Sequence, residues 1–184
     1  PKNKVIGMAG VLDTSRFKYF LSQELQVPIS KVDSFVLGGH GDTMVPVPNR
    51  TTVNGENLND LMNQGKISKA KIEEIIDRTR KGGAEVVKLL ETGSAFYGPA
   101  ASGIEMADSY LNDKKKVLPC AAYLDGEYDI KDLYVGVPVI IGSGGIEKVV
   151  ELNLDDEEQK HFQTSIEAVR ELFDAAKNID PSLV

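Results

Sequence analysis

The sequence contains a single cysteine, Cys120. One cysteine cannot close a disulfide within the chain, and the N-terminus lacks the basic, apolar and small-residue segments that make up a secretory signal. The chain also has no initiator methionine and runs almost at once from Pro1 into an apolar stretch. We therefore expect a reducing, cytoplasmic setting, and we expect the chain to be part of a longer protein.

The sequence has fewer basic than acidic residues, and it has no long apolar run. The 21 Lys and Arg residues against 28 Asp and Glu residues give a formal net charge of −7, which does not suit a nucleic-acid backbone or an anionic membrane. The longest apolar runs, such as residues 135–141, contain Gly and Pro and fall far short of the roughly 20 residues of a membrane span. We expect a soluble protein that binds neither nucleic acid nor membranes.

Metal ligands and nucleophiles are also scarce. The chain has two histidines, His40 and His161, and they are too far apart in the sequence to form a ligand motif with Cys120, so no metal site is predicted. Cys120 lies in an apolar strand pattern, where a small buried side chain is the usual explanation. His161 falls off the apolar stripe of its predicted helix and is interpreted as a surface residue.

The chain of 184 residues is 41% hydrophobic, enough for one domain with its own core. Apolar residues at helical spacing predict five helices, the longest with a kink or an interruption at Gly82 and Gly83. The predicted helices cover residues 15–25, 58–62, 68–93, 99–111 and 155–176. The last is the clearest, because Asp155 and Glu158 resemble a capping box ahead of an apolar stripe.

Strand-forming residues separated by glycine predict an antiparallel meander at residues 117–124, 133–141 and 146–152, and shorter strands at 34–37 and 43–48. The predicted fold class is α+β, with antiparallel strands packed with helices. Residues 142–145 superficially suggest a phosphate-binding turn. Such a turn needs a following helix, and a strand is predicted here instead, so a hairpin is favoured and no cofactor-phosphate site is found.

Two features could carry chemistry. His40 lies between two glycines and before Asp42, on a loop whose glycines allow close backbone approach. It is either a turn residue or an acid-base group. Asp13 and Arg16 stand near the predicted first helix, where Asp13 is either an ordinary N-cap or an orienting carboxylate, and Arg16 either a first-turn residue or a fork for a substrate carboxylate. The two interpretations of this pair are compatible.

Three motifs together resemble a known family. Residues 10–17 read GVLDTSRF, residues 38–46 read GGHGDTMVP, and 24 residues separate Arg16 from His40. Residues 92–102 read TGSAFYGPAAS. These motifs closely resemble the catalytic half of the lactate/malate dehydrogenase family, and the third resembles malate dehydrogenases built on the lactate-dehydrogenase plan.

The resemblance implies an NAD-dependent hydride transfer at C2 of a small 2-hydroxy or 2-keto dicarboxylic acid. His40 would be the general acid-base, Asp13 would orient its imidazole, and Arg16 would bind the substrate carboxylate. The loop from Ser94 to Pro99 would flank the pocket near the nicotinamide. The lactate/malate dehydrogenase C-terminal domain would then span residues 1–184.

The resemblance also implies what this chain lacks. Family members carry an N-terminal Rossmann domain that binds NAD and a mobile loop that selects the substrate, and neither is present here, so the isolated chain is predicted to be inactive. The parent is expected to form homo-oligomers. Two alternatives stay open: a lactate dehydrogenase C-terminal domain, and a non-catalytic oligomerisation module. The enzyme interpretation requires His40 and Asp13 to lie within hydrogen-bond reach, with Arg16 opening onto the same cavity.

Overall fold

The computed structural model describes residues 1–183, and a five-stranded antiparallel sheet lies at its centre. The strands are β2 (Val36–Gly38), β3 (Met44–Pro46), β6 (Lys116–Asp125), β7 (Lys131–Gly142) and β8 (Gly145–Val149). They run in the order β3-β2-β7-β6, and β8 pairs with β7. β6 pairs with β7 along nearly its full length, so the predicted antiparallel meander is confirmed.

A second, small sheet was not predicted. It contains β1 (Val32–Asp33), β4 (Thr52–Val53) and β5 (Glu56–Asn57). Asn54 and Gly55 join β4 to β5 with positive φ angles of 53° and 82°. Positive φ at both central residues defines the turn that an Asn-Gly pair favours, so a sequence signal for this hairpin was present.

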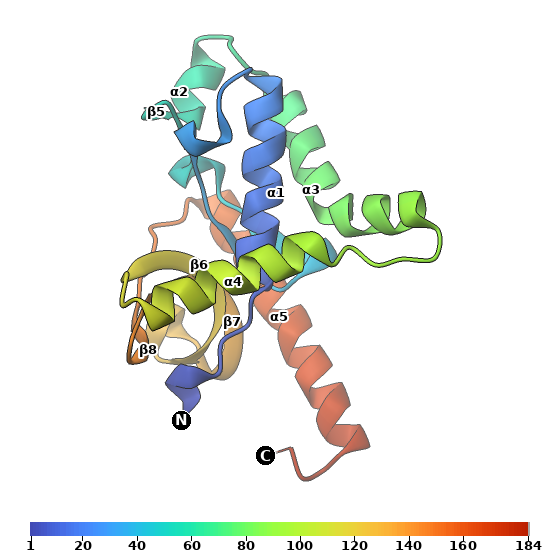
Figure 1. Ribbon diagram of the computed structural model, residues 1–184, viewed down its shortest axis with the longest axis vertical. Coiled ribbons are helices and arrows are strands. Elements are labelled where there is room, and N and C mark those ends of the chain that lie inside the picture. Colours follow the sequence, from blue (N-terminus) through green and yellow to red (C-terminus); the bar gives the residue numbers. More distant parts are fainter. Residues whose placement is uncertain (184) are drawn as a thin grey trace.

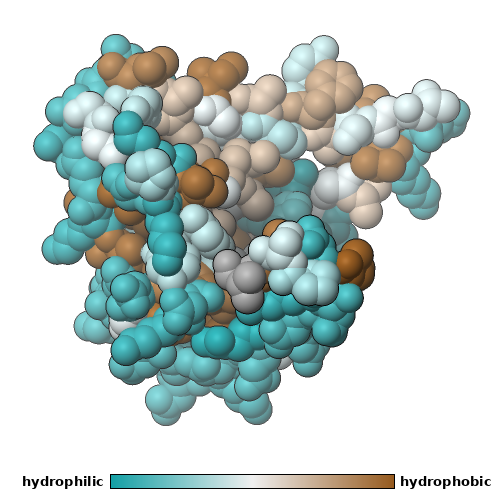
Figure 2. Space-filling model, turned by 90° about the horizontal axis from the view of Figure 1, so that it is seen from below, coloured by the Kyte–Doolittle hydropathy of each residue, from teal (hydrophilic) through white to brown (hydrophobic). Residues whose placement is uncertain are grey.

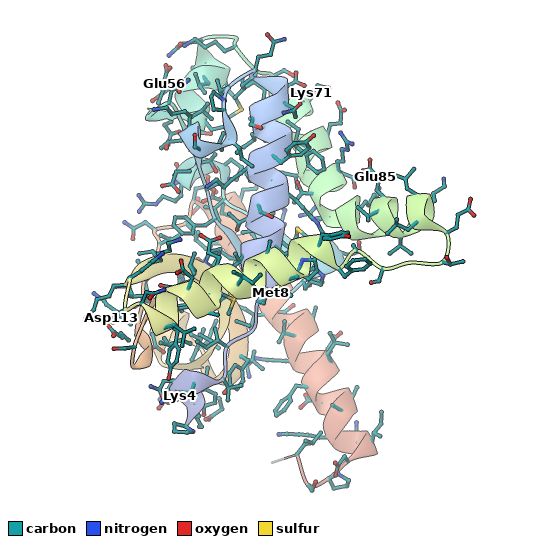
Figure 3. The ribbon with its side chains drawn as sticks, in the orientation of Figure 1. Lys4, Met8, Glu56, Lys71, Glu85 and Asp113 are labelled. Carbon is teal, nitrogen blue, oxygen red and sulfur yellow. The ribbon has the colours of Figure 1, made fainter. Side chains whose placement is uncertain are left out.

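Five α-helices pack around the sheets, as the α+β prediction requires (Figure 1). They are α1 (Ala9–Glu24), α2 (Leu58–Asn63), α3 (Lys69–Leu90), α4 (Tyr97–Leu111) and α5 (Asp156–Ile179). α4 crosses the beginning of α1 near Met8 (Figure 3). Among residues 1–183, no helix combines the length and the apolar character needed to cross a membrane.

The observed beginning of α1 shows that the interpretation of Asp13 as an N-cap was wrong. The helix begins at Ala9 after the N-cap Met8, so Asp13 lies inside the helix and is not its N-cap. The first turn of α1 also packs closely on β6. A Cβ atom on Gly10 would lie 2.5 Å from the carbonyl oxygen of Pro119, so only glycine lets this first turn approach β6.

The predicted kink in α3 is present. The helix is continuous from Lys69 to Leu90 across Gly82 and Gly83, and its second half turns away from α1 (Figure 1). Large apolar side chains on the outer parts of the helices are exposed, among them Leu89, Tyr97 and Leu172 at 77%, 81% and 72%. Seen from below, apolar atoms cover part of the surface beside a strongly hydrophilic region (Figure 2). The chain therefore leaves apolar surface uncovered.

α5 begins with the predicted capping box. The Asp155 carboxylate accepts a hydrogen bond from the backbone N–H of Glu158, and the Glu158 carboxylate accepts one from the backbone N–H of Asp155. Phe162 and Ile166 of the predicted apolar stripe are buried against the sheet, whereas Phe173 is 39% exposed. Only the first half of α5 therefore anchors the helix to the body, and the second half extends away from it (Figure 1).

Phe162→Ala is expected to destabilise the chain by about 3–5 kcal/mol, because the ring is fully buried and packs edge-to-face on Tyr128 at 5.3 Å. Urea unfolding followed by circular dichroism measures this change. Phe173→Ala on the same helix is the matched control and should cost less than about 1 kcal/mol. Equal losses for the two variants would show that the halves of α5 are packed alike.

Candidate active site

α1 holds Asp13 and Arg16 in place because it contacts both hydrophobic cores of the molecule. Val11 packs in the core formed by the large sheet and α5, while Phe17 and Leu21 pack in the core shared with α2 and α3. The two candidate side chains lie three residues apart on this helix, a spacing that places them on one face. A helix fixed at both ends gives these side chains little freedom to move.

His40 lies two residues after the end of β2. Gly38 pairs with Met44 of β3 and with Gly136 of β7, so the strand is held on both sides where the loop begins. A Cβ atom on Gly136 would lie 2.4 Å from the carbonyl oxygen of Gly38, so this close pairing requires glycine on β7. After His40 the chain turns into a short 3₁₀ helix, η3 (Gly41–Thr43), which begins with a positive φ of 75°.

The loop and the helix bring three predicted site residues together. The Nδ1 atom of His40 lies 2.8 Å from Oδ2 of Asp13, and Nη1 of Arg16 lies 3.4 Å from Oδ1 of the same carboxylate. The Asp13 side chain is 1% exposed, whereas the His40 side chain is 53% exposed. Because a carboxylate accepts, Nδ1 carries the proton of this bond, which leaves Nε2 to bind another group.

The electrostatics of the site favour a protonated imidazole. The hydrogen bond to Asp13 and the charge of that carboxylate raise the pKa of His40 above its ordinary value, against smaller opposing effects of partial burial and of the Arg16 charge. The charged side chains that act on His40 are thus both on α1. Since the ordinary value is near 6.5, His40 can exchange a proton near neutral pH.

Asp13→Asn is expected to lower the pKa of His40, because the imidazolium loses the carboxylate that stabilises it. A raised pKa stabilises the folded chain fully below the ordinary histidine value, and this contribution disappears as pH rises through the folded-state value. The free-energy difference between wild type and Asp13→Asn should therefore be larger at about pH 5.5 than at about pH 8.5 in urea unfolding. An NMR titration of His40 that is unchanged by the substitution would contradict the coupling.

Gly82 of α3 makes room for Arg16. A Cβ atom on Gly82 would lie 3.2 Å from Cδ of Arg16, which is a tight contact, whereas one on Gly83 would lie 3.5 Å from Nη2, which is an ordinary one. The Arg16 side chain is 15% exposed and lies between α1 and α3. Gly82 therefore allows the close packing of α3 against the Arg16 side chain.

The structure does not join Ser94 and Pro99 to the other site residues. Ser94 is exposed in the segment between α3 and α4, and Pro99 is the third residue of α4. A Cβ atom on Gly98 would lie 2.9 Å from Cδ1 of Leu12, so the beginning of α4 touches α1 beside Asp13. Within residues 1–183, no hydrogen bond or ion pair links Ser94 or Pro99 to this site. Their placement beside the pocket stays a prediction.

Three cavities of about 450, 400 and 250 Å³ lie elsewhere in the structure, and none of the three is lined by His40, Asp13 or Arg16. The expected opening of Arg16 onto a cavity shared with His40 is therefore not seen in these three. The three side chains are joined through the Asp13 carboxylate.

The remaining candidates lie away from the site. Residues 142–145 join β7 to β8 as a hairpin, as predicted. Cys120 is buried in β6, and burial raises the pKa of its thiol to about 12. His161 is exposed on α5. No group of three or more His, Cys, Asp or Glu residues that could hold a metal ion is found in the part of the chain that the structure describes.

Comparison with known proteins shows the family. Residues 10–179 match the family model of the lactate/malate dehydrogenase alpha/beta C-terminal domain. A malate dehydrogenase of Pelagibacter ubique (strain HTCC1062) is 59% identical over 183 residues, which is 100% of this chain and 57% of that protein. The chain therefore belongs to the lactate/malate dehydrogenase family.

Solved structures agree in fold. The crystal structure of Cryptosporidium parvum malate dehydrogenase matches 97% of this chain and 57% of that chain, with a TM-score of 0.94 and 50% identity. The lactate dehydrogenase of the same organism, complexed with lactic acid and nicotinamide adenine dinucleotide, matches 92% of this chain and 54% of that chain, with a TM-score of 0.90 and 46% identity. The chain spans little more than half the length of these relatives.

Proposed function

We propose that this chain is the substrate-binding and catalytic domain of a malate dehydrogenase, which interconverts malate and oxaloacetate by hydride transfer with NAD. The observation that carries the proposal is the 2.8 Å contact between His40 and Asp13, with Arg16 on the same carboxylate. The names of the Pelagibacter ubique and Cryptosporidium parvum malate dehydrogenases support the choice of substrate. Each role below is part of this proposal.

His40 exchanges the proton. During oxidation its Nε2 atom takes the proton of the C2 hydroxyl of malate as the carbonyl forms, and during reduction it returns that proton. Asp13 holds Nδ1 protonated, which keeps Nε2 free as the base, and it stabilises the imidazolium after the proton has moved. The raised pKa of His40 suits a group that must both accept and release a proton near neutral pH.

Arg16 binds the C1 carboxylate of the substrate. A planar guanidinium offers two parallel N–H donors to a carboxylate, a geometry that lysine cannot reproduce. The contact with Asp13 at 3.4 Å is long and uses one nitrogen, so further N–H donors can face a ligand. A substrate held by Arg16 would place its C2 hydroxyl toward His40.

NAD supplies the hydride acceptor and donor when it is bound. The glycine-rich turn at residues 142–145 joins two strands and opens no helix toward a phosphate, so it does not offer the usual dinucleotide-binding turn. We therefore assign NAD binding to an N-terminal Rossmann domain in the parent protein. The exposed apolar side chains on α3, α4 and α5 would pack against that domain or against another subunit of a homo-oligomer.

The proposal is tested by joining residues 1–184 to the N-terminal domain of the Pelagibacter ubique malate dehydrogenase. The fusion should oxidise malate with NAD, whereas this chain alone and the N-terminal domain alone should show no turnover. An inactive fusion that is folded and binds NAD would favour a non-catalytic module. Turnover by the isolated chain would contradict the assignment of NAD binding to a separate domain.

A second candidate is lactate dehydrogenase. The similarity to the Cryptosporidium parvum lactate dehydrogenase favours it, since that protein is 46% identical to this chain. The fusion cannot separate the two, because its substrate-selecting loop would come from the donor. The full-length protein must instead be assayed with oxaloacetate and with pyruvate. A higher kcat/KM for pyruvate than for oxaloacetate would show that the protein acts on lactate and pyruvate, and the proposal of malate would be wrong.

A further inference from the structure

We infer that Ser165 of α5 is a positioning residue for His40: its hydroxyl group holds the backbone N–H of Gly39, the residue before His40, so that the ring stays beside Asp13. A role for Ser165 in catalysis rests on the proposed function, in which His40 is the acid-base group. Nothing in the sequence near His40 indicates this residue, because 126 positions separate Ser165 from the loop.

The contact is direct and buried. The backbone N–H of Gly39 donates a hydrogen bond of 2.8 Å to the Oγ atom of Ser165, and Ser165 is 1% exposed. A Cβ atom on Gly38 would lie 2.2 Å from that Oγ atom, and one on Gly39 would lie 3.4 Å from Cγ2 of Val169. Glycine at position 38 therefore lets the backbone ahead of His40 reach the surface of α5, with Gly39 in ordinary contact with it.

Burial alone does not position the imidazole of His40, because the side chain is 53% exposed. The ring is held by its bond to Asp13, and the glycines on both sides of His40 carry no side chains that could fix the loop backbone. The peptide between Gly39 and His40 sets the direction in which the His40 side chain leaves the backbone. Ser165 is the hydrogen-bond acceptor for the N–H group of Gly39, one peptide away from that link.

α5 is itself a firm support at this point. Phe162 and Ile166, on either side of Ser165, are buried in the core of the large sheet. The capping box at Asp155 and Glu158 fixes the beginning of the helix. The site is thus assembled from three parts of the chain: α1 supplies Asp13 and Arg16, the loop supplies His40, and α5 holds the loop.

Without the hydroxyl group, the N–H of Gly39 loses its acceptor, and the loop must move to find another or bring in water. Movement of the loop would lengthen the bond between His40 and Asp13. A merely structural serine would lower stability and leave the titration of His40 unchanged, so the titration separates the two roles. The charged side chains that act on the pKa of His40 are Asp13 and Arg16, both of α1.

The experiment is an NMR titration of His40 in the 184-residue chain. In Ser165→Ala we expect the pKa of His40 to fall toward its ordinary value. Ser109→Ala is the matched control, because Ser109 is another buried helical serine, bonded to the Ile141 carbonyl and the Lys116 N–H. An unchanged His40 titration in folded Ser165→Ala would overturn the inference, as would an equal change in the control.

Two further variants keep the test decisive. Ser165→Cys fills similar space with a weaker acceptor, so it covers the case in which the alanine variant does not fold, and it should give a smaller fall in the same direction. In an Asp13→Asn background, Ser165→Ala should no longer move the His40 titration. An equal shift in both backgrounds would mean that Ser165 does not act through the pair.

The titration does not depend on turnover, so its outcome and that of the dehydrogenase assay are distinguishable. In the active fusion, Ser165→Ala should lower kcat by about tenfold to a hundredfold with little change in KM, because substrate binding by Arg16 is untouched. A rise in KM with kcat unchanged would show that Ser165 does not position His40.

Discussion

Replacing His40 with asparagine is expected to reduce kcat of the active fusion by about a thousandfold or more, since a positioned acid-base group contributes about 10² to 10⁴ in rate. Asparagine is small enough for the loop, and its amide can still donate to Asp13. It cannot exchange a proton near neutral pH. The loss should therefore fall on kcat, while the KM for malate, which depends on Arg16, changes little.

His161→Asn provides the matched control for this measurement. His161 is the other histidine of the chain, exposed on α5 and away from the site. It should leave kcat unchanged, and urea unfolding must show that both variants remain folded at the pH of the assay. A His40→Asn fusion with undiminished turnover would remove the acid-base role and leave only a resemblance of motifs.

Local signals predicted the elements that depend on local contacts. The Asp155 and Glu158 pair and the apolar stripe after it placed α5 nearly to the residue, because a capping box and a helical stripe are complete within a few turns. The predicted beginning of α1 was wrong, and the first turn that it missed packs on Pro119, more than a hundred residues away, a contact that no local signal shows. Asn54 and Gly55 carried a usable turn signal that was not used.

The candidate site also combines features that the sequence shows locally with features that depend on distant contacts. The spacing of Asp13 and Arg16 on one helix is readable, since residues three apart share a face. The approach of His40 to Asp13 is not, because it depends on the pairing of Gly38 with Gly136 and on the packing of α1 against β2. Only the resemblance to the family connected the two segments before the structure did. Ser165 had neither a local signal nor a family motif.

Arg16→Lys is expected to raise the KM for malate by roughly 30- to 150-fold in the active fusion, because losing a two-bond charged contact costs about 2–3 kcal/mol. Lysine keeps the charge, so long-range attraction of the substrate persists and the change reports the fork geometry. The kcat value at saturating malate should fall much less, since His40 and Asp13 remain paired.

The control is Arg78→Lys, which changes the same residue type on α3 where the guanidinium pairs with Glu85 on the surface. It should leave both KM and kcat unchanged, because exposed ion pairs contribute little. Arg16 also packs against Gly82 and Gly83, so urea unfolding must show that Arg16→Lys remains folded. If the folded variant binds malate as the parent does, Arg16 holds Asp13 and not the substrate, and the carboxylate must be bound from the other domain.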